Sequence, residues 1–439
     1  MNFSQIRTHL TPPRFLIITN LTAAGIAFIQ GLIVARVLGA SGYGYVGILV
    51  TIGGMMANFW DMRIADLATK LHYRPHPNDK SRSASAMAAL ILSIVLSVIL
   101  AASVTVACWF LWDYFTETKP LVIWLMIQGV VTGLSFFIGM LYTLQRLTSR
   151  FYIFGTGRVV AQIFSLLIMV ACLRNTPTIQ GYYDGLLLGT VMTGAIAMLL
   201  LYHAWRTSFQ QSLFALSLNG FKAALGTYWQ ERHFLASANI FSYSKMLSRS
   251  GDILLFGYFA NDAATGVYRL ARTLVDNLNV FTDALGQYYT PHFMQRMSEG
   301  GHTQMRLSAR RFAVLGIGLT ALMMPAAAIG LTVINTYFLH GAYTHLASTT
   351  ALLICNFVWI CGVHTWLWPS LLHHNRMHLL AKTSILAALS QLALLALFCI
   401  YLGTDPRLAA IASIIYFVLL YVPLLLWWFK ESPKQEVLA

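Results

Sequence analysis

Two stretches of the sequence place charged side chains at helical spacing inside apolar surroundings. Lys245, Arg249 and Asp252 are separated by four and three residues, and a second series has the same intervals: Arg269, Arg272, Asp276, Asn279 and Asp283. Residues three and four apart lie on one face of a helix, so each series predicts a single polar stripe. Arginine presents a planar fork of N–H donors that suits phosphate. The stripes therefore predict a binding site for phosphate or pyrophosphate.

Arg36 and Arg158 lie in other apolar segments and complete the set of predicted cavity cations. A cation at the bilayer centre costs roughly 2.5 to 3.5 kcal/mol on insertion scales, so such residues normally face protein or water. The structural alternative is ion pairing within one helix, because Arg249 and Asp252 are correctly spaced for it, as are Arg272 and Asp276. The acidic candidates for ion coupling or charge balance are Asp61, Asp252, Asp276 and Asp283.

The segments that carry these residues are too apolar for a soluble protein. The chain is 57% hydrophobic and 10% charged, and no Asp, Glu, Lys or Arg occurs between Arg311 and Arg376. A span of the bilayer needs about 20 apolar residues, and several runs exceed that length. Such runs must be helices, because barrel strands would alternate in polarity over about 10 residues. The sequence therefore predicts a polytopic membrane protein.

Apolar runs bounded by charges or turn residues predict an all-α fold of about twelve transmembrane helices in two pseudo-repeated six-helix lobes. The first lobe, residues 1–203, and the second, residues 233–439, are joined by a cytoplasmic amphipathic linker over residues 204–232. The predicted spans are 15–38, 43–69, 83–112, 120–143, 152–173, 185–203, 233–259, 265–290, 312–337, 347–372, 383–401 and 408–429.

The distribution of basic residues predicts the orientation of these spans. With the N-terminus in the cytoplasm, the outer connections contain only Lys119, Arg174 and Arg407, and most of the 29 basic residues fall in the inner connections and tails. Positively charged connections stay on the cytoplasmic side, so both termini are expected there. The net charge of +14 then indicates contact with anionic membrane lipids, and a nucleic-acid partner is not expected.

An internal repeat relates the beginnings of the two lobes. An offset of 222 residues carries Gly44 onto Gly266 and Asp61 onto Asp283. Two lobes of six spans with a common motif favour a transporter whose substrate path lies between the repeats. The sequence contains no catalytic constellation and no metal-ligand spacing, so neither a cofactor nor a metal ion is expected. Two pairs of glycines at helical spacing are interpreted as packing seams: Gly129 with Gly133, and Gly185 with Gly189.

Two segments carry a resemblance to a known family. The segment ARVLGASGYGYVGILVTIGGMMANFWD resembles the opening of the Wzx-type polysaccharide flippases of the multidrug/oligosaccharidyl-lipid/polysaccharide exporter superfamily. The segment GDILLFGYFANDAATGVYRLARTLVDNLNVFTDALGQYYTPHF is similar to that family's second-half motif. The matching positions there are Asp252, Gly257, Gly266, Tyr268, Ala271 and Pro291. After Asp61 the chain departs from the family pattern, because Met62 and Arg63 stand where Leu-Gly is common.

The resemblance implies a flippase that moves undecaprenyl-pyrophosphate-linked oligosaccharide repeat units, for O-antigen or exopolysaccharide, between leaflets of the bacterial inner membrane by alternating access. A lipid-linked oligosaccharide is the implied substrate, and a polysaccharide polymerase and a chain-length regulator are candidate partners. One alternative is a cation-coupled drug exporter of the same superfamily. Another is a membrane-embedded polysaccharide polymerase or ligase, but enzymes of that kind are expected to have a sizeable outer loop, which the predicted connections lack.

Overall fold

The computed structural model describes residues 12–61, 79–114, 121–147, 151–209, 246–278, 302–373 and 376–436, together with positions 64, 65, 68, 226, 239, 243 and 244. Within these ranges all regular elements are helices. The chain divides into two compact units. Unit 1 is Met1–Val37 with Leu49–Tyr243, and unit 2 is Leu38–Ile48 with Ser244–Ala439. The all-α prediction is confirmed for the described residues.

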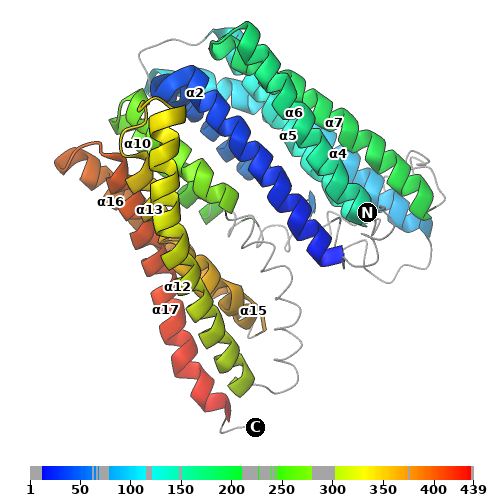
Figure 1. Cartoon of the computed structure of the whole chain (residues 1–439). Coiled ribbons are helices and arrows are strands. Elements are labelled where there is room, and N and C mark those ends of the chain that lie inside the picture. The colour runs from blue at the N-terminus through cyan, green and yellow to red at the C-terminus, as the bar shows by residue number, and fades with distance from the viewer. Residues whose placement is uncertain are drawn as a thin grey trace, which may run out of the picture. The chain divides into compact units, whose positions relative to one another are not determined.

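Unit 1 is built from long apolar helices. They are the larger part of α2 (Pro12–Trp60), then α4 (Asp79–Leu111), the short η1 (Trp112–Tyr114), α5 (Val122–Leu147), α6 (Phe151–Asn175) and α7 (Ile179–Phe209). In Figure 1, α4 packs against α5, and α6 and α5 both pack against α7. Of the predicted linker, residues 204–209 continue α7, whereas the rest of 210–232 apart from position 226 lies outside the described residues.

Unit 2 contains shorter and less regular helices besides long ones. They are η2 (Leu247–Gly251), α10 (Asp252–Phe259), a helix over 262–278, α12 (His302–Val333), η3 (Ile334–Phe338), α13 (Leu346–Ile354), α14 (Phe357–Trp359), η4 (Ile360–His364), α15 (Thr365–His373), α16 (Met377–Tyr401) and α17 (Pro406–Glu436). Here α16 packs against α10 and α17, and α13 packs against α12 and α17.

The described helices include nine that are long and apolar enough to cross a membrane. One of them, Ile18–Trp60, covers most of the first and the second predicted span, because α2 consists of two helices that join across a kink at Gly39. Gly39 has φ 68° and ψ 177°, a conformation that residues with a Cβ rarely adopt. Large apolar side chains point outward on these helices, such as Phe110 at 71% and Leu199 at 69% exposure. The protein is therefore a multi-pass membrane protein whose outer surface suits lipid.

Glycines bring neighbouring helices of unit 1 into close contact. A methyl group on Gly129 or Gly133 of α5 would come within 2.4 Å of the α4 carbonyl oxygens of Ala101 or Ser97. Gly185 and Gly189 of α7 are packed in the same way against Met169 and Ser165 of α6. Small residues let helix backbones approach in a membrane, where no hydrophobic effect drives the helices together. The predicted packing seams are confirmed.

Candidate functional site

A buried ion pair lies inside unit 2. Asp252 is the first residue of α10 and is 0% exposed, and Arg272 on the helix over 262–278 is 7% exposed. Arg272 Nη1 lies 3.7 Å from Asp252 Oδ2, and the hydroxyl of Tyr268 donates a hydrogen bond of 2.7 Å to the same oxygen. Burying an isolated charge is very costly, so each of the two charges stabilises the other.

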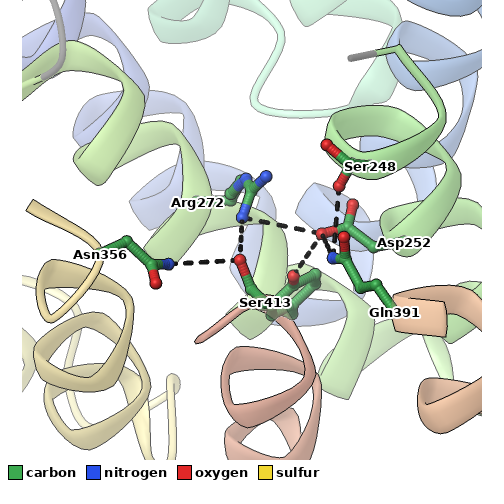
Figure 2. A network of polar contacts seen from close by, with 7 residues as sticks. Ser248, Asp252, Arg272, Asn356, Gln391 and Ser413 are labelled. Carbon is green, nitrogen blue, oxygen red and sulfur yellow. Dashed lines mark hydrogen bonds and ion pairs between the residues drawn. The ribbon is translucent and has the colours of Figure 1, made fainter. Parts of the chain in front are cut away.

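Polar side chains from three further segments surround this pair, as Figure 2 shows. Arg272 Nη1 donates to Ser413 Oγ on α17 at 3.1 Å, and Asn356 Nδ2 donates to the same hydroxyl at 3.3 Å. Gln391 on α16 donates through Nε2 to Asp252 Oδ2 and to the carbonyl oxygen of Ser248, both at 3.3 Å. The network therefore joins η2, α10, the helix over 262–278, α16, α17 and the segment before α14.

This arrangement changes the interpretation of Arg272 as a cavity cation. Within the described residues, Asp252 pairs with Arg272 across two helices, and Arg249, its predicted partner in sequence, is not in contact with it. Asp276 is half-buried and acts electrostatically on Arg272. Arg272 therefore has its charge balanced inside unit 2, and Asp252 is the group that balances it.

Arg269 and three glycines form a close crossing between the two repeat-related segments, all within unit 2. A methyl group on Gly44 would lie 1.9 Å from the carbonyl oxygen of Asp262, and one on Gly266 would lie 2.0 Å from that of Ala40. The offset of 222 relates these two contacts, so the crossing is pseudo-symmetric. Arg269 Nη1 donates to the Gly47 carbonyl oxygen, again across 222 residues. Arg269 thus stabilises the crossing through a backbone carbonyl group.

Arg249 is in a different situation from Arg269 and Arg272. It lies in the π-helical turn η2, and its side chain is half-buried. Within the described part of the chain no group forms a hydrogen bond or an ion pair with its guanidinium. A cation inside a predicted membrane span without an acidic partner is suited to an anionic guest.

Arg158 in unit 1 resembles Arg249 in having no acidic partner among the described residues. It lies on α6, is half-buried, and donates through Nη1 to Asn20 Oδ1 on α2 at 2.9 Å. Asn20 is neutral, and among the described residues no carboxylate pairs with Arg158. Arg158 is therefore a cation of unit 1 whose charge no described carboxylate balances.

The remaining predicted residues are distributed over other parts of the chain. Arg36 is exposed on α2, three residues before the kink at Gly39. Asp61 is half-buried directly after the end of α2. Lys245 and Asp283 lie outside the described residues, so their predicted roles stay predictions.

The sequence interpretation missed the neutral members of the network. Tyr268, Asn356, Gln391 and Ser413 were not predicted to belong to the site, although Gln391 is a polar residue in a long apolar helix, which is a usable signal. Buried amides and hydroxyls need hydrogen-bond partners, so an isolated Gln in a membrane span indicates a polar neighbour on another helix.

The fold defined by these helices is that of a superfamily of membrane transporters. An inward-facing multidrug resistance MATE family transporter of the MOP superfamily aligns over 95% of both chains with a TM-score of 0.64 and 14% identity. A MOP superfamily transporter from Pyrococcus furiosus aligns over 97% of both chains with a TM-score of 0.62 and 12% identity. Lipid II flippase MurJ aligns over 92% of this chain and 86% of its own, with a TM-score of 0.60 and 11% identity.

Residues 14–297 match the family model described as polysaccharide biosynthesis protein, and the chain belongs to that family. No curated protein sequence matches the chain. The identities to the solved structures are low, so those structures show the fold, and the family match connects the chain to polysaccharide biosynthesis. The resemblance found in the sequence is thereby confirmed at the level of this family.

Proposed function

We propose that the protein flips undecaprenyl-pyrophosphate-linked oligosaccharide repeat units from the cytoplasmic to the periplasmic leaflet of the bacterial inner membrane by alternating access. The repeat units would be those of an O-antigen or an exopolysaccharide. Membership of a polysaccharide biosynthesis family supports the saccharide, and the MOP transporter fold supports movement across the membrane. Both termini would lie in the cytoplasm, and a polymerase and a chain-length regulator would act on the product.

The observation that carries this proposal is the half-buried guanidinium of Arg249 in unit 2, which forms no ion pair or hydrogen bond with the described residues. Pyrophosphate is a dense anion with several acceptor oxygens, and an arginine fork binds two of them at once. In unit 1, Arg158 donates to the neutral amide of Asn20 and has no carboxylate partner among the described residues. Arg269 and Arg272 would act indirectly, because their guanidinium groups already bind a carbonyl oxygen and the Asp252 carboxylate.

The rival exporter of cationic drugs requires an accessible acidic group in the transport path. Asp252 is completely buried and its charge is balanced by Arg272, so it is a poor binding group for a cationic drug. Asp252 is therefore unsuited to a cationic substrate, whereas Arg249 is suited to an anionic one.

The test is export of polysaccharide in a strain that lacks the chromosomal gene and carries Arg249→Ala. We expect surface polysaccharide to fall by about tenfold or more, because a charge-assisted hydrogen bond contributes about 1.5 to 3 kcal/mol. Arg249→Lys keeps the charge but loses the fork, so partial export is expected. The matched control is Arg311→Ala, which removes an exposed arginine of α12 in the same unit.

Membrane amounts of all variants are compared by immunoblot, so that loss of export is separated from loss of protein. Lipid-linked oligosaccharide should accumulate in the cytoplasmic leaflet of the Arg249→Ala strain. Normal surface polysaccharide in that strain would contradict the proposed site. Normal polysaccharide together with loss of resistance to a cationic drug, when the whole gene is deleted, would favour the drug exporter instead.

A further inference from the structure

Aromatic rings from three neighbouring segments of unit 2 form a cluster around Tyr421 of α17. Trp359 at the end of α14 lies nearly parallel to Tyr421, with ring centroids 6.1 Å apart and 7° between the planes. Phe417, one turn earlier on α17, is also nearly parallel to it, at 6.1 Å and 15°. His364, the last residue of η4, meets Tyr421 edge to face at 6.1 Å. The rings therefore form an ordered aromatic surface.

The members of this cluster differ in how far they are buried. Tyr421 is 4% exposed, whereas Trp359, Phe417 and His364 are half-buried. The indole N–H of Trp359 makes no hydrogen bond within the described part of the chain. Buried tryptophans usually have a partner for this group. Trp359 thus has a ring that stacks on Tyr421 and an indole N–H that can donate to a bound ligand.

Arg249 lies near this cluster, because hydrogen bonds and the ion pair of the polar network join both regions. Its neighbour Ser248 is linked through Gln391, Asp252 and Arg272 to Ser413 of α17 and to Asn356, three residues before Trp359. Arg249 and His364 are both in π-helical turns, η2 and η4, although they are more than 100 residues apart. Such turns are rare in proteins, and those that occur are frequently found at functional sites. Unit 2 therefore places a half-buried aromatic ring close to a cation that has no ion pair among the described residues.

We propose that Trp359, supported by Tyr421, binds the sugar ring that is attached directly to the pyrophosphate, while Arg249 binds the pyrophosphate itself. This inference rests on the proposed function and adds the part of the substrate that is recognised. In a glycosyl pyrophosphate the anion and the first sugar are joined by one glycosidic bond, so their binding groups must be neighbours. The C–H face of a pyranose ring is apolar and packs on an aromatic ring, and its hydroxyls accept from an indole N–H. A cation beside a half-buried tryptophan complements both parts.

The experiment measures binding by the purified full-length protein in lipid nanodiscs. The probes are undecaprenyl pyrophosphate without sugar and the same lipid carrying one glucose, one galactose or one N-acetylglucosamine. We expect at least one glycosylated lipid to bind the wild-type protein more tightly than the bare lipid. Trp359→Ala should weaken binding of that lipid by about tenfold and leave binding of the bare lipid unchanged. Trp359→Phe, which keeps a flat ring, should recover part of the affinity.

Trp109→Ala is the matched control, because this tryptophan of α4 in unit 1 is 58% exposed and far from the cluster in sequence. Arg249→Ala should weaken the bare and the glycosylated lipids alike. Equal wild-type affinity for all four lipids would overturn the sugar subsite, and so would an equal loss for bare and glycosylated lipids in Trp359→Ala. Undiminished binding of the bare lipid by Arg249→Ala would instead contradict the proposed pyrophosphate site. The two proposals therefore fail through different measurements.

Discussion

The two units use different chemistry at equivalent positions. In unit 1, α2 and α6 are joined by the neutral amides of Gln30 and Gln162, whose Oε1 and Nε2 atoms are 3.1 Å apart. The 222-residue offset that relates Gly47 to Arg269 carries Gln30 onto Asp252. In unit 2 that aspartate binds Gln391 of α16 at 3.3 Å. In each unit a helix, α2 or α10, thus contacts a glutamine of another helix. The contact is neutral in unit 1 and charged in unit 2.

The charged version requires additional partners. The same offset relates Arg272 to Val50, so unit 2 carries both an acidic and a basic residue where unit 1 carries neither. A buried carboxylate without a cation would be strongly destabilising, and Arg272 and Tyr268 both contact Asp252 Oδ2. The difference shows that charge inside a span is not by itself a sign of substrate binding. Arg272 belongs to the packing of unit 2, whereas Arg249 and Arg158 keep charge without a described acidic partner.

The largest effect is expected from removing one charge of the unit 2 pair. Arg272→Met leaves Asp252 buried without a cation, and we expect the free energy of unfolding to fall by about 3 to 5 kcal/mol. Chemical denaturation of the detergent-solubilised protein, followed by circular dichroism, measures this change. The double variant Asp252→Asn, Arg272→Met is the control, because it removes both charges of the pair and leaves a neutral contact, as in unit 1. It should recover most of the lost stability and keep polysaccharide export. Equal losses in the single and double variants would contradict an ion pair.

A smaller effect is expected at the glycine crossing. Gly266→Ala would place a methyl group 2.0 Å from the Ala40 carbonyl oxygen, so the helices must separate. We expect a loss of about 1 to 3 kcal/mol, the usual range for overpacking. Gly44→Ala should lose a similar amount because its contact is the pseudo-symmetric equivalent. Gly25→Ala in unit 1 has no atom within 4 Å of the added methyl group and should be unchanged or slightly more stable. An unchanged Tm for Gly266→Ala would show that the crossing is loose.

The smallest effect is expected for the neutral glutamine contact of unit 1, which is compared here with its charged counterpart in unit 2. Gln162→Leu removes one neutral hydrogen bond in unit 1, which contributes about 1 kcal/mol. Gln391→Leu removes a donor from the buried carboxylate of Asp252 and should cost more, about 1.5 to 3 kcal/mol. Thermal unfolding of both variants under one set of detergent conditions gives the comparison. Losses of the same size would mean that the charge of Asp252 does not strengthen its hydrogen bond with Gln391.

Much of the fold was predictable from local sequence. Uncharged runs such as that between Arg311 and Arg376 require helices in a membrane, and the structure has helices in the described parts of all the predicted spans. The break expected between the first two spans lies at Gly39, where the backbone leaves the helical conformation and two helices join across a kink in α2. Glycine adopts such a conformation more readily than residues with a Cβ, so Gly39 directly after the first apolar run is the sequence signal for this break.

The candidate site was predictable only in part. Spacing by three and four placed Asp252 and Arg249 in one polar stripe, and it offered Arg249 as the partner of Asp252. The actual partner is Arg272, which is 20 residues away and lies on another helix. Periodicity reports only contacts within a helix, so a pair that forms across helices cannot be distinguished from two free charges.

The sequence by itself determined that this chain is a helical membrane protein with a repeated motif and several cations inside apolar segments. These properties follow from the cost of exposing backbone and charge to lipid, which depends on residue type and run length alone. Tertiary structure decided which cations are neutralised. Arg272 is paired by Asp252, Arg269 binds the carbonyl group of Gly47, and Arg249 is left without an ion pair among the described residues, because charge balance depends on distances between helices.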